Sequence, residues 1–322
     1  MTQKYLIGLG CSWTQGEGGY PQDVVDAHNG RTQIRPGQKG QPDTDYYLRE
    51  HELENSWVNQ LTKYHFPEYK SINLGIKGIG NQGAVNQLHF ANNYDFTEAE
   101  GLVILMLTGF ERFDVFQTRP MDHFGFQEPD GYNKGHFRHE KWRTAWPIET
   151  TSGDSGFWNC YARELWSEQF VACTTMIALL NLQSWAKAHN FQIVLANSFN
   201  QRMNSNEQHN AFEGVLNWLV EYSGPLASQF DWSCYIHNDK DVEYGAFMEK
   251  LVDLDGLIPK PASVHWGGYN EIYNPRNLST HSEYLTNDDG AHPTIKGYRV
   301  IADELAKFIK KKNYTGNSTL LP

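Results

Sequence analysis

Short, mostly apolar runs recur along the chain and predict buried strands at residues 3–9, 101–108 and 191–196. A further short strand is predicted at 70–74, Lys-Ser-Ile-Asn-Leu. The clearest is 101–108, Gly-Leu-Val-Ile-Leu-Met-Leu-Thr, which is apolar almost throughout. A continuous run of this kind is typical of a strand that is buried on both faces, as strands of a parallel sheet are.

Between these runs, apolar residues recur every three or four positions, which is the spacing of an amphipathic helix. The first such helix has Asn55 or Ser56 as its cap. A glycine-rich turn over 75–83 leads into the second. Strands and helices therefore alternate, which predicts a parallel α/β sheet with helices on both faces. The predicted helices are 56–65, one from the glycine-rich turn to about residue 92, 160–189, 208–222 and 294–311.

Three long segments interrupt this alternation, at about 17–54, 110–157 and 224–286. Each is rich in Gly, Pro, Asn, Asp and aromatic residues. Structureless loops of this length are uncommon in compact domains unless they are functional. We therefore expect a single domain over residues 1–322, with these segments as insertions at the C-terminal edge of the sheet, where open α/β sheets bind ligands.

The charge balance argues against nucleic acid as a partner. The chain carries 38 acidic and 27 basic residues, for a formal net charge of -11, whereas nucleic-acid binders present a basic patch. No run approaches the roughly 18 apolar residues of a membrane span, and the first apolar run is too short for a secretory signal. We expect no membrane partner, no signal peptide, and a soluble protein of the cytoplasm or of a virion.

The aromatic content and the spacing of the cysteines narrow the class of protein further. Aromatic residues make up 14 % of the chain, more than a core alone needs, so some are expected to line a surface or groove that contacts carbohydrate or a partner. The four cysteines lack a Cys-x-x-Cys spacing, which argues against a disulfide scaffold and against a structural zinc site. They are Cys11, Cys160, Cys173 and Cys234.

Two short segments near the ends of the chain contain the candidate catalytic residues. The first strand breaks directly into Ser12, which places a hydroxyl at the C-terminal edge of the sheet. Near the other end, His292 lies just before the last helix, with Asp289 three residues earlier and Pro293 at a position that proline favours in a first helical turn. A hydroxyl, an imidazole base and an orienting carboxylate are the parts of an activated serine nucleophile. Their meeting requires the last loop to return beside the first strand.

Such a nucleophile also needs hydrogen-bond donors for the oxyanion of its tetrahedral intermediate. The backbone N–H of Ser12 is one candidate. The turn after the second strand supplies Gly78, where the backbone can approach closely, and the side-chain amide of Asn81 is a third candidate.

These segments resemble the sequence blocks of the SGNH/GDSL hydrolases. Residues 10–16, Gly-Cys-Ser-Trp-Thr-Gln-Gly, look like the first block, and 73–78 look like the second, whose glycine donates to the oxyanion. Residues 289–293, Asp-Gly-Ala-His-Pro, look like the fifth block. The resemblance implies a flavodoxin-like three-layer α/β/α fold and an esterase, lipase or carbohydrate O-deacetylase that needs no metal or organic cofactor.

The chain departs from the family pattern at two places. Cys11 stands where the family usually has Asp, a position that does not perform the chemistry. More seriously, the third block of the family, Gly-x-Asn-Asp, is missing after the strand 101–108. The Asn of that block stabilises the oxyanion, so here either Asn81 or Arg112 substitutes for it, or the site is weakened or inactive.

The sequence thus predicts a serine hydrolase of carboxylic esters, with acetylated carbohydrate as the favoured substrate. The alternative is a weak or inactive member of the fold that serves as a binding or structural component of a larger virion or surface assembly, or as a homo-oligomer. An acyltransferase that uses the same serine is a third class.

Overall fold

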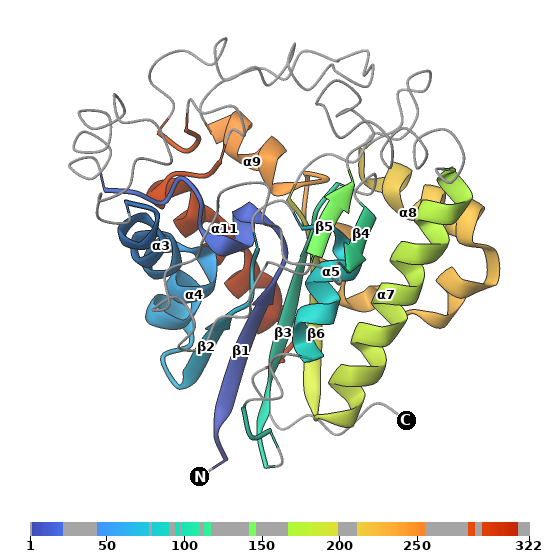
Figure 1. Ribbon diagram of the computed structural model, residues 1–322, viewed down its shortest axis with the longest axis horizontal. Helices are drawn as coiled ribbons and strands as arrows, with labels where there is room; N and C mark the ends of the chain where they lie inside the picture. Colours follow the sequence, from blue (N-terminus) through green and yellow to red (C-terminus); the bar gives the residue numbers. More distant parts are fainter. Residues whose placement is uncertain are drawn as a thin grey trace.

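A parallel sheet of four strands forms the centre of the molecule (Figure 1). Its strands are β1 (Lys4–Leu9), β2 (Tyr69–Asn73), β3 (Glu100–Leu107) and β6 (Phe191–Asn197). They lie in the order β2-β1-β3-β6, all parallel. The computed structural model describes residues 2–21, 44–76, 79–89, 94–96, 98–109, 113–116, 142–145, 167–198, 211–254, 283–286 and 292–314.

The strand order explains the apolar runs in the sequence. β1 and β3 are central, and every residue of β3 from Leu102 to Leu107 is buried. The order also matches the first four strands of a flavodoxin-like sheet, in which the strand order reverses between β1 and β3 while all strands stay parallel. The prediction of a parallel α/β fold is confirmed, and the C-terminal edge beside β1 is the place where such sheets bind ligands.

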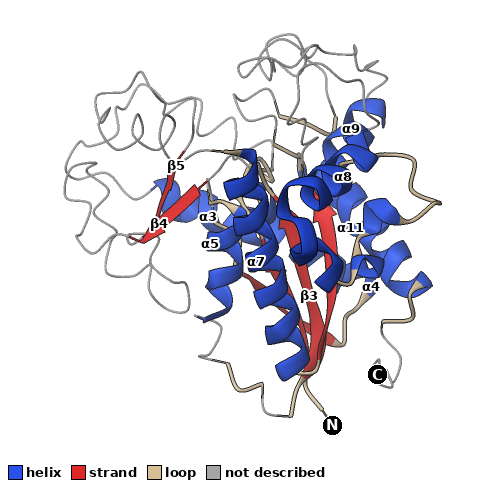
Figure 2. Ribbon diagram, turned by 90° about the vertical axis from the view of Figure 1, so that its right-hand side faces the viewer, coloured by secondary structure: helices blue, strands red, loops and turns tan. Residues whose placement is uncertain are grey.

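Helices cover both faces of the sheet (Figures 1 and 2). On one face α4 packs on β1 and β2 and against α11, and on the other α5 and α7 pack on β3 and β6, with α8 against α7. The helices are α1 (Ser12–Gln15), α3 (Thr44–Asn55), α4 (Trp57–His65), α5 (Asn81–Asn86), α7 (Glu168–Ala188), α8 (Ala211–Ser223), α9 (Phe247–Leu254) and α11 (Ile295–Lys311), with 3-10 turns at Gln87–His89, Gly224–Gln229, Trp232–Cys234 and Ile236–Asn238.

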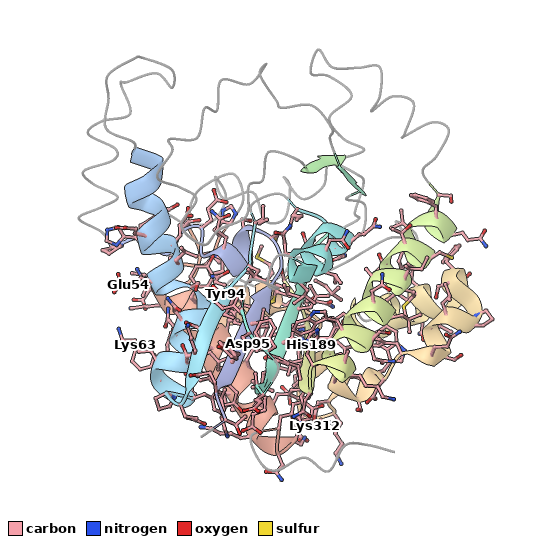
Figure 3. The ribbon with its side chains drawn as sticks, turned by 60° about the horizontal axis from the view of Figure 1, so that its bottom comes forward. Glu54, Lys63, Tyr94, Asp95, His189 and Lys312 are labelled. Atoms are coloured by element: carbon pink, nitrogen blue, oxygen red, sulfur yellow. The ribbon has the colours of Figure 1, made fainter. Side chains whose placement is uncertain are left out.

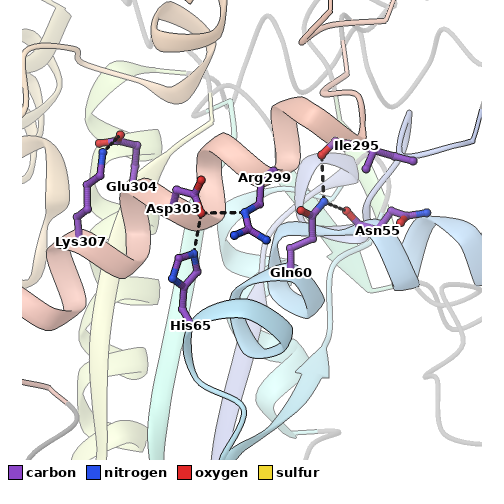
Figure 4. Close-up of polar contacts among 8 residues, drawn as sticks. All are labelled: Asn55, Gln60, His65, Ile295, Arg299, Asp303, Glu304 and Lys307. Carbon is purple, nitrogen blue, oxygen red and sulfur yellow. Dashed lines mark hydrogen bonds and ion pairs between the residues drawn. The ribbon is translucent and has the colours of Figure 1, made fainter.

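Polar contacts between α4 and α11 bring the end of the chain beside its beginning (Figure 4). Gln60 donates to the backbone oxygen of Ile295 at 3.1 Å. His65 and Arg299 both contact the carboxylate of Asp303, at 2.6 and 2.9 Å. These contacts fix the start of α11, and therefore the residues just before it, next to the α4 side of β1.

The segment 224–286 differs from the expected insertion. Up to Leu254 it is folded on the sheet: Tyr235 and Phe247 are buried in the core, and Tyr235 forms a parallel bridge with Leu195 of β6. The bridge occupies the position of a fifth strand reduced to one residue. The sequence did not predict this part of the core, because closely spaced Gly, Pro and Asp residues break any strand or helix periodicity there.

The other two expected insertions also contain regular structure. The segment 17–54 carries most of α3, and 110–157 carries β4 (Phe113–Phe116) and β5 (Trp142–Ala145), which pair antiparallel. Two helices differ from expectation: the one expected over 160–189 begins at Glu168 with Ser167 as its cap, and the one expected to reach about residue 92 ends at Asn86, followed by a 3-10 turn to His89. The ends of α4 and α11 are close to expectation. Ser56, not Asn55, caps α4 by accepting from the Asn59 N–H. Thr294 caps α11.

Candidate active site

The turn after β1 presents Ser12 at the C-terminal edge of the sheet. Gly10 has φ +145°, and a Cβ there would lie 2.3 Å from Thr14 Oγ1, so the sharp turn requires glycine. Ser12 then opens the short helix α1, which ends at Gly16 with φ +108°. The Thr14 hydroxyl donates to the Leu9 carbonyl at 3.2 Å and ties the helix back to the strand.

The end of β2 clamps this turn from the side. Asn73 donates from Nδ2 to the backbone oxygen of Thr14 at 2.8 Å and accepts from the Gly75 N–H at 2.9 Å. A Cβ on Gly75 would lie 2.3 Å from the Gln15 nitrogen, so the backbone of 73–76 runs directly against α1. The second sequence block therefore holds the serine turn in place.

The loop before α11 carries the imidazole of His292. Its backbone oxygen accepts from the Thr286 N–H at 2.8 Å, and the next residue, Pro293, forms a bridge with Leu285. Pro293 lies before the Thr294 cap, so the prediction that it occupies the first helical turn is wrong. Its ring instead fits the extended bridge, which needs no N–H at that position.

The two side chains meet across 280 residues of sequence. His292 Nε2 lies 2.9 Å from Ser12 Oγ, and both residues are buried, with 9 % and 7 % of their surface exposed. This is the distance of a hydrogen bond. A neutral imidazole nitrogen in this position can accept the serine proton, which is the geometry a general base needs.

Glu17 is a site residue that sequence reasoning missed. Its Oε2 lies 3.2 Å from His292 Nε2, the same ring nitrogen that faces Ser12, and its side chain is 12 % exposed. The segment 17–54 was expected to be an insertion, although Glu17 directly follows the Gly16 that ends the serine turn. A carboxylate one residue beyond a serine motif was the available signal.

A second buried carboxylate lies behind the site. Glu52 accepts hydrogen bonds from Gln15 Nε2 and from the Tyr20 hydroxyl. Burial and this carboxylate raise the pKa of Tyr20, and burial raises that of Tyr298, so both phenols stay neutral. Glu52 holds α3 against the loop that carries Glu17.

Asn81 makes a structural contact at the end of β3. Its Oδ1 accepts from the Thr108 N–H at 2.9 Å and its Nδ2 donates to the Thr108 oxygen at 3.2 Å. Both residues are buried. The amide thus pairs with both backbone groups of Thr108, which fixes the end of β3, where the SGNH/GDSL pattern has a third block that this chain lacks.

Replacing Asn81 by alanine tests this structural role against the oxyanion role. We expect the free energy of unfolding to fall by about 2–4 kcal/mol, because two buried backbone groups lose these partners, while kcat of the folded variant falls less than about tenfold. Urea unfolding and esterase assays measure the two, with Gln82→Ala on the same helix as control. A rate loss of about 10²–10³ at unchanged stability would assign Asn81 to the oxyanion instead.

Three predicted site residues lie outside the described residues. They are Asp289, Gly78 and Arg112. Their roles as orienting acid, oxyanion donor and substitute donor stay predictions. The described backbone runs to Ile76 and resumes at Ile79, and the Ile76 N–H donates to the Gly10 oxygen at 3.0 Å, so the turn starts next to the serine segment.

The opposite edge of the sheet carries an open depression. Its lining includes Tyr94, Asp95, Phe96 and His189 (Figure 3), and the Phe96 ring packs 6.0 Å from that of His189. It lies at the amino ends of the strands, whereas Ser12 follows the carboxyl end of β1. Within the described ranges, no group of three or more His, Cys, Asp or Glu residues could hold a metal ion, and no helix is long and apolar enough to cross a membrane.

Comparison with known proteins gives weak matches only. No protein-family model matches the sequence, and no curated protein matches it significantly. The similar solved structures include TesA, which is 12 % identical with a TM-score of 0.42, over 96 % of this chain and 99 % of that one. Another is a possible lipase from Chitinophaga pinensis DSM 2588, 15 % identical with a TM-score of 0.34, over 96 % and 99 %. At these TM-scores the function has to be argued from the site itself.

Proposed function

We propose that this protein is a serine hydrolase of carboxylic esters, with Ser12 as nucleophile and His292 as general base. The observation that carries the proposal is the 2.9 Å contact between Ser12 Oγ and His292 Nε2. Burial of both side chains adds support, because a proton-transfer pair works best when water is kept away from it. The resemblance of residues 10–16 and 289–293 to the SGNH/GDSL blocks points the same way.

The proposed reaction proceeds in two halves. Ser12 Oγ attacks the ester carbonyl while its proton moves to His292 Nε2, and the protonated imidazole then gives that proton to the departing alcohol. Water hydrolyses the acyl-enzyme by the same proton path in reverse. Asp289 would hold the ring from its other nitrogen. The oxyanion would be received by the backbone N–H groups of Ser12 and Gly78.

Acetylated carbohydrate is the substrate class that we propose. β3 ends at the edge that carries Ser12, and the sequence that follows it, 110–157, is rich in aromatic residues. Aromatic side chains commonly line small-molecule sites. We expect kcat/KM to fall as the acyl chain is lengthened from acetyl to octanoyl, and acetate to be released from acetylated oligosaccharides. Equal rates for all chain lengths would contradict this preference.

A covalent probe tests the nucleophile directly. We expect a fluorophosphonate to label one serine per chain, mapped by mass spectrometry to the peptide that contains Ser12, because only an activated hydroxyl reacts readily. Ser12→Ala should not be labelled, and His292→Ala should be labelled at least about 10³-fold more slowly. Ser223→Ala, a buried serine on α8 that donates to the Leu219 oxygen, is the matched control and should be labelled like the wild type.

The alternative is a binding or structural component without turnover. It predicts that the wild type resists the probe to the same degree as Ser12→Ala. Labelling at a serine other than Ser12 would contradict the assignment of the nucleophile but not the reaction class.

A further inference from the structure

Two oxygen atoms face one nitrogen of the candidate base. Ser12 Oγ lies 2.9 Å and Glu17 Oε2 3.2 Å from His292 Nε2. In a triad the carboxylate addresses the ring nitrogen that points away from the serine. Glu17 therefore cannot play the part proposed for Asp289, and its place at the reacting nitrogen needs a separate explanation.

The position of Glu17 is fixed by its backbone. Its N–H donates to the Ser12 oxygen at 3.1 Å, and its own oxygen accepts from the Tyr298 hydroxyl of α11 at 2.7 Å. The next residue, Gly18, has φ +89°, and a Cβ there would lie 2.9 Å from His292 Cβ. The loop thus passes against the imidazole so closely that only glycine fits, and it delivers the Glu17 side chain to one face of the site.

Whether His292 Nε2 carries a proton decides which of its two contacts, with Ser12 Oγ or with Glu17 Oε2, is favourable. Ser12 can donate to Nε2 only when that nitrogen carries a lone pair. Glu17 forms an ion pair with Nε2 only when that nitrogen is protonated and the ring is charged. An opposite charge at this distance favours the charged form of the imidazole. The two partners therefore favour opposite protonation states of one atom.

We propose that Glu17 is a positioning residue that stabilises His292 in its protonated form, the form produced when Ser12 attacks. This proposal rests on the proposed function. As the bond from Ser12 Oγ to the acyl carbon forms, the serine proton passes to Nε2, and the Glu17 carboxylate beside it stabilises the imidazolium without taking the proton. The same proton then leaves with the alcohol oxygen as the ester C–O bond breaks.

This arrangement has a cost at low pH. Once a solvent proton occupies Nε2, Ser12 loses its acceptor, while the ion pair between the imidazolium and Glu17 is complete. Glu17 should therefore move the acid limb of the pH–rate profile to higher pH while it raises the rate on the plateau. The nearby titratable groups are Glu52 on α3, Tyr20 of the same loop, Tyr298 on α11 and Cys11. Burial raises the pKa of both tyrosines, so they stay neutral. Among the residues that the structure describes around this loop, Glu52 is a second carboxylate. Asp289 is the orienting acid of the proposed function.

The test compares Glu17→Gln with the wild type over pH 4–9. We expect the acid limb of kcat/KM to move to lower pH, because the variant no longer places an opposite charge beside the protonated ring nitrogen. The plateau should fall about three- to tenfold, because the protonated base is less stabilised in the transition state. Glu17→Asp, which keeps the charge, should recover part of the shift. A purely structural role would lower the rate without moving the limb.

Glu52→Gln is the matched control, since it removes a buried carboxylate of the same cluster that bonds Gln15 and Tyr20 instead of the imidazole. We expect a smaller shift of the limb from it than from Glu17→Gln. A shift as large as that of Glu17→Gln would show a general field effect and overturn the specific role.

A readout without turnover separates this proposal from the proposed function. The Cε1–H resonance of His292, identified by its loss in His292→Ala, is titrated by NMR in wild type and in Glu17→Gln. We expect the midpoint to move to lower pH in the variant. Equal midpoints would overturn the proposal even in an active esterase, and a shifted midpoint in a protein without esterase activity would sink the proposed function alone.

Discussion

Alanine at Ser12, at His292, or at both should lower kcat/KM for p-nitrophenyl acetate to nearly the same level, at least about 10⁴-fold below the wild type. The reason is that the two side chains take part in the same step, the transfer of the serine proton during attack. The serine attacks only as its proton leaves, and the nitrogen 2.9 Å away is the acceptor. Once either partner is absent, loss of the other removes nothing further.

The double mutant is the informative member of this set. If the two losses multiplied, the side chains would act independently and the contact between them would be incidental to catalysis. Ser223→Ala, the buried serine on α8, should keep the wild-type rate. Circular dichroism and urea unfolding of each variant show whether a lost rate reflects a lost site or a lost fold.

Acidification from pH 7 to pH 4 should cost the folded state about 3 kcal/mol through a single residue, His237. This histidine is 1 % exposed, and its Nδ1–H donates to the Tyr244 oxygen at 3.0 Å. The rings of Tyr235, Tyr244 and Phe247 surround it at centroid distances of 5.4–5.6 Å. Burial is the main cause that lowers its pKa from 6.5 to about 4.

The sign follows from where the proton binds. Between pH 6.5 and 4 the unfolded chain binds a proton at this residue and the folded chain does not, so the free energy of unfolding falls as the pH falls. The stabilisation is complete above pH 6.5 and is lost toward pH 4. A shift of about 2.5 units at 1.36 kcal/mol each gives about 3 kcal/mol after partial protonation at pH 4 is counted.

His237→Asn measures this contribution. The asparagine Nδ2 can keep the bond to the Tyr244 oxygen but does not titrate, so the variant should be less stable than the wild type at pH 7 and should lose about 3 kcal/mol less between pH 7 and pH 4. Urea unfolding at a series of pH values gives both curves. Parallel curves would mean that the histidine is charged or solvated in the folded protein.

Hydrophobic patterning along the chain was enough to predict the sheet, because a strand buried on both faces is apolar almost throughout. The runs 3–9, 101–108 and 191–196 became β1, β3 and β6, and the mixed segment 70–74 became the partly exposed edge strand β2. It failed where pairing shrinks to one residue. Tyr235 extends the sheet by a single bridge, and a single bridge leaves no repeat for a pattern to detect.

The candidate site was predictable as far as its chemistry is local. Ser12 directly follows the first strand and His292 directly precedes the last helix, and both elements are recognisable in the sequence. A hydroxyl and an imidazole at such positions indicate a nucleophile and a base. Asn81 was one candidate donor to the oxyanion, because it lies in the same glycine-rich turn as Gly78. Its pairing with Thr108, 27 residues away, was not predictable, because that contact depends on how α5 lies across the end of β3.

The sequence by itself determined the alternation of strands and helices and the residue types available at the two ends of the chain. Only the tertiary structure decided which of them meet. The packing of α11 on α4 brings His292 to Ser12, and the glycine loop at 16–19 turns Glu17 onto the same nitrogen. Side-chain preferences act over a few residues, whereas these meetings result from burying the apolar faces of whole helices.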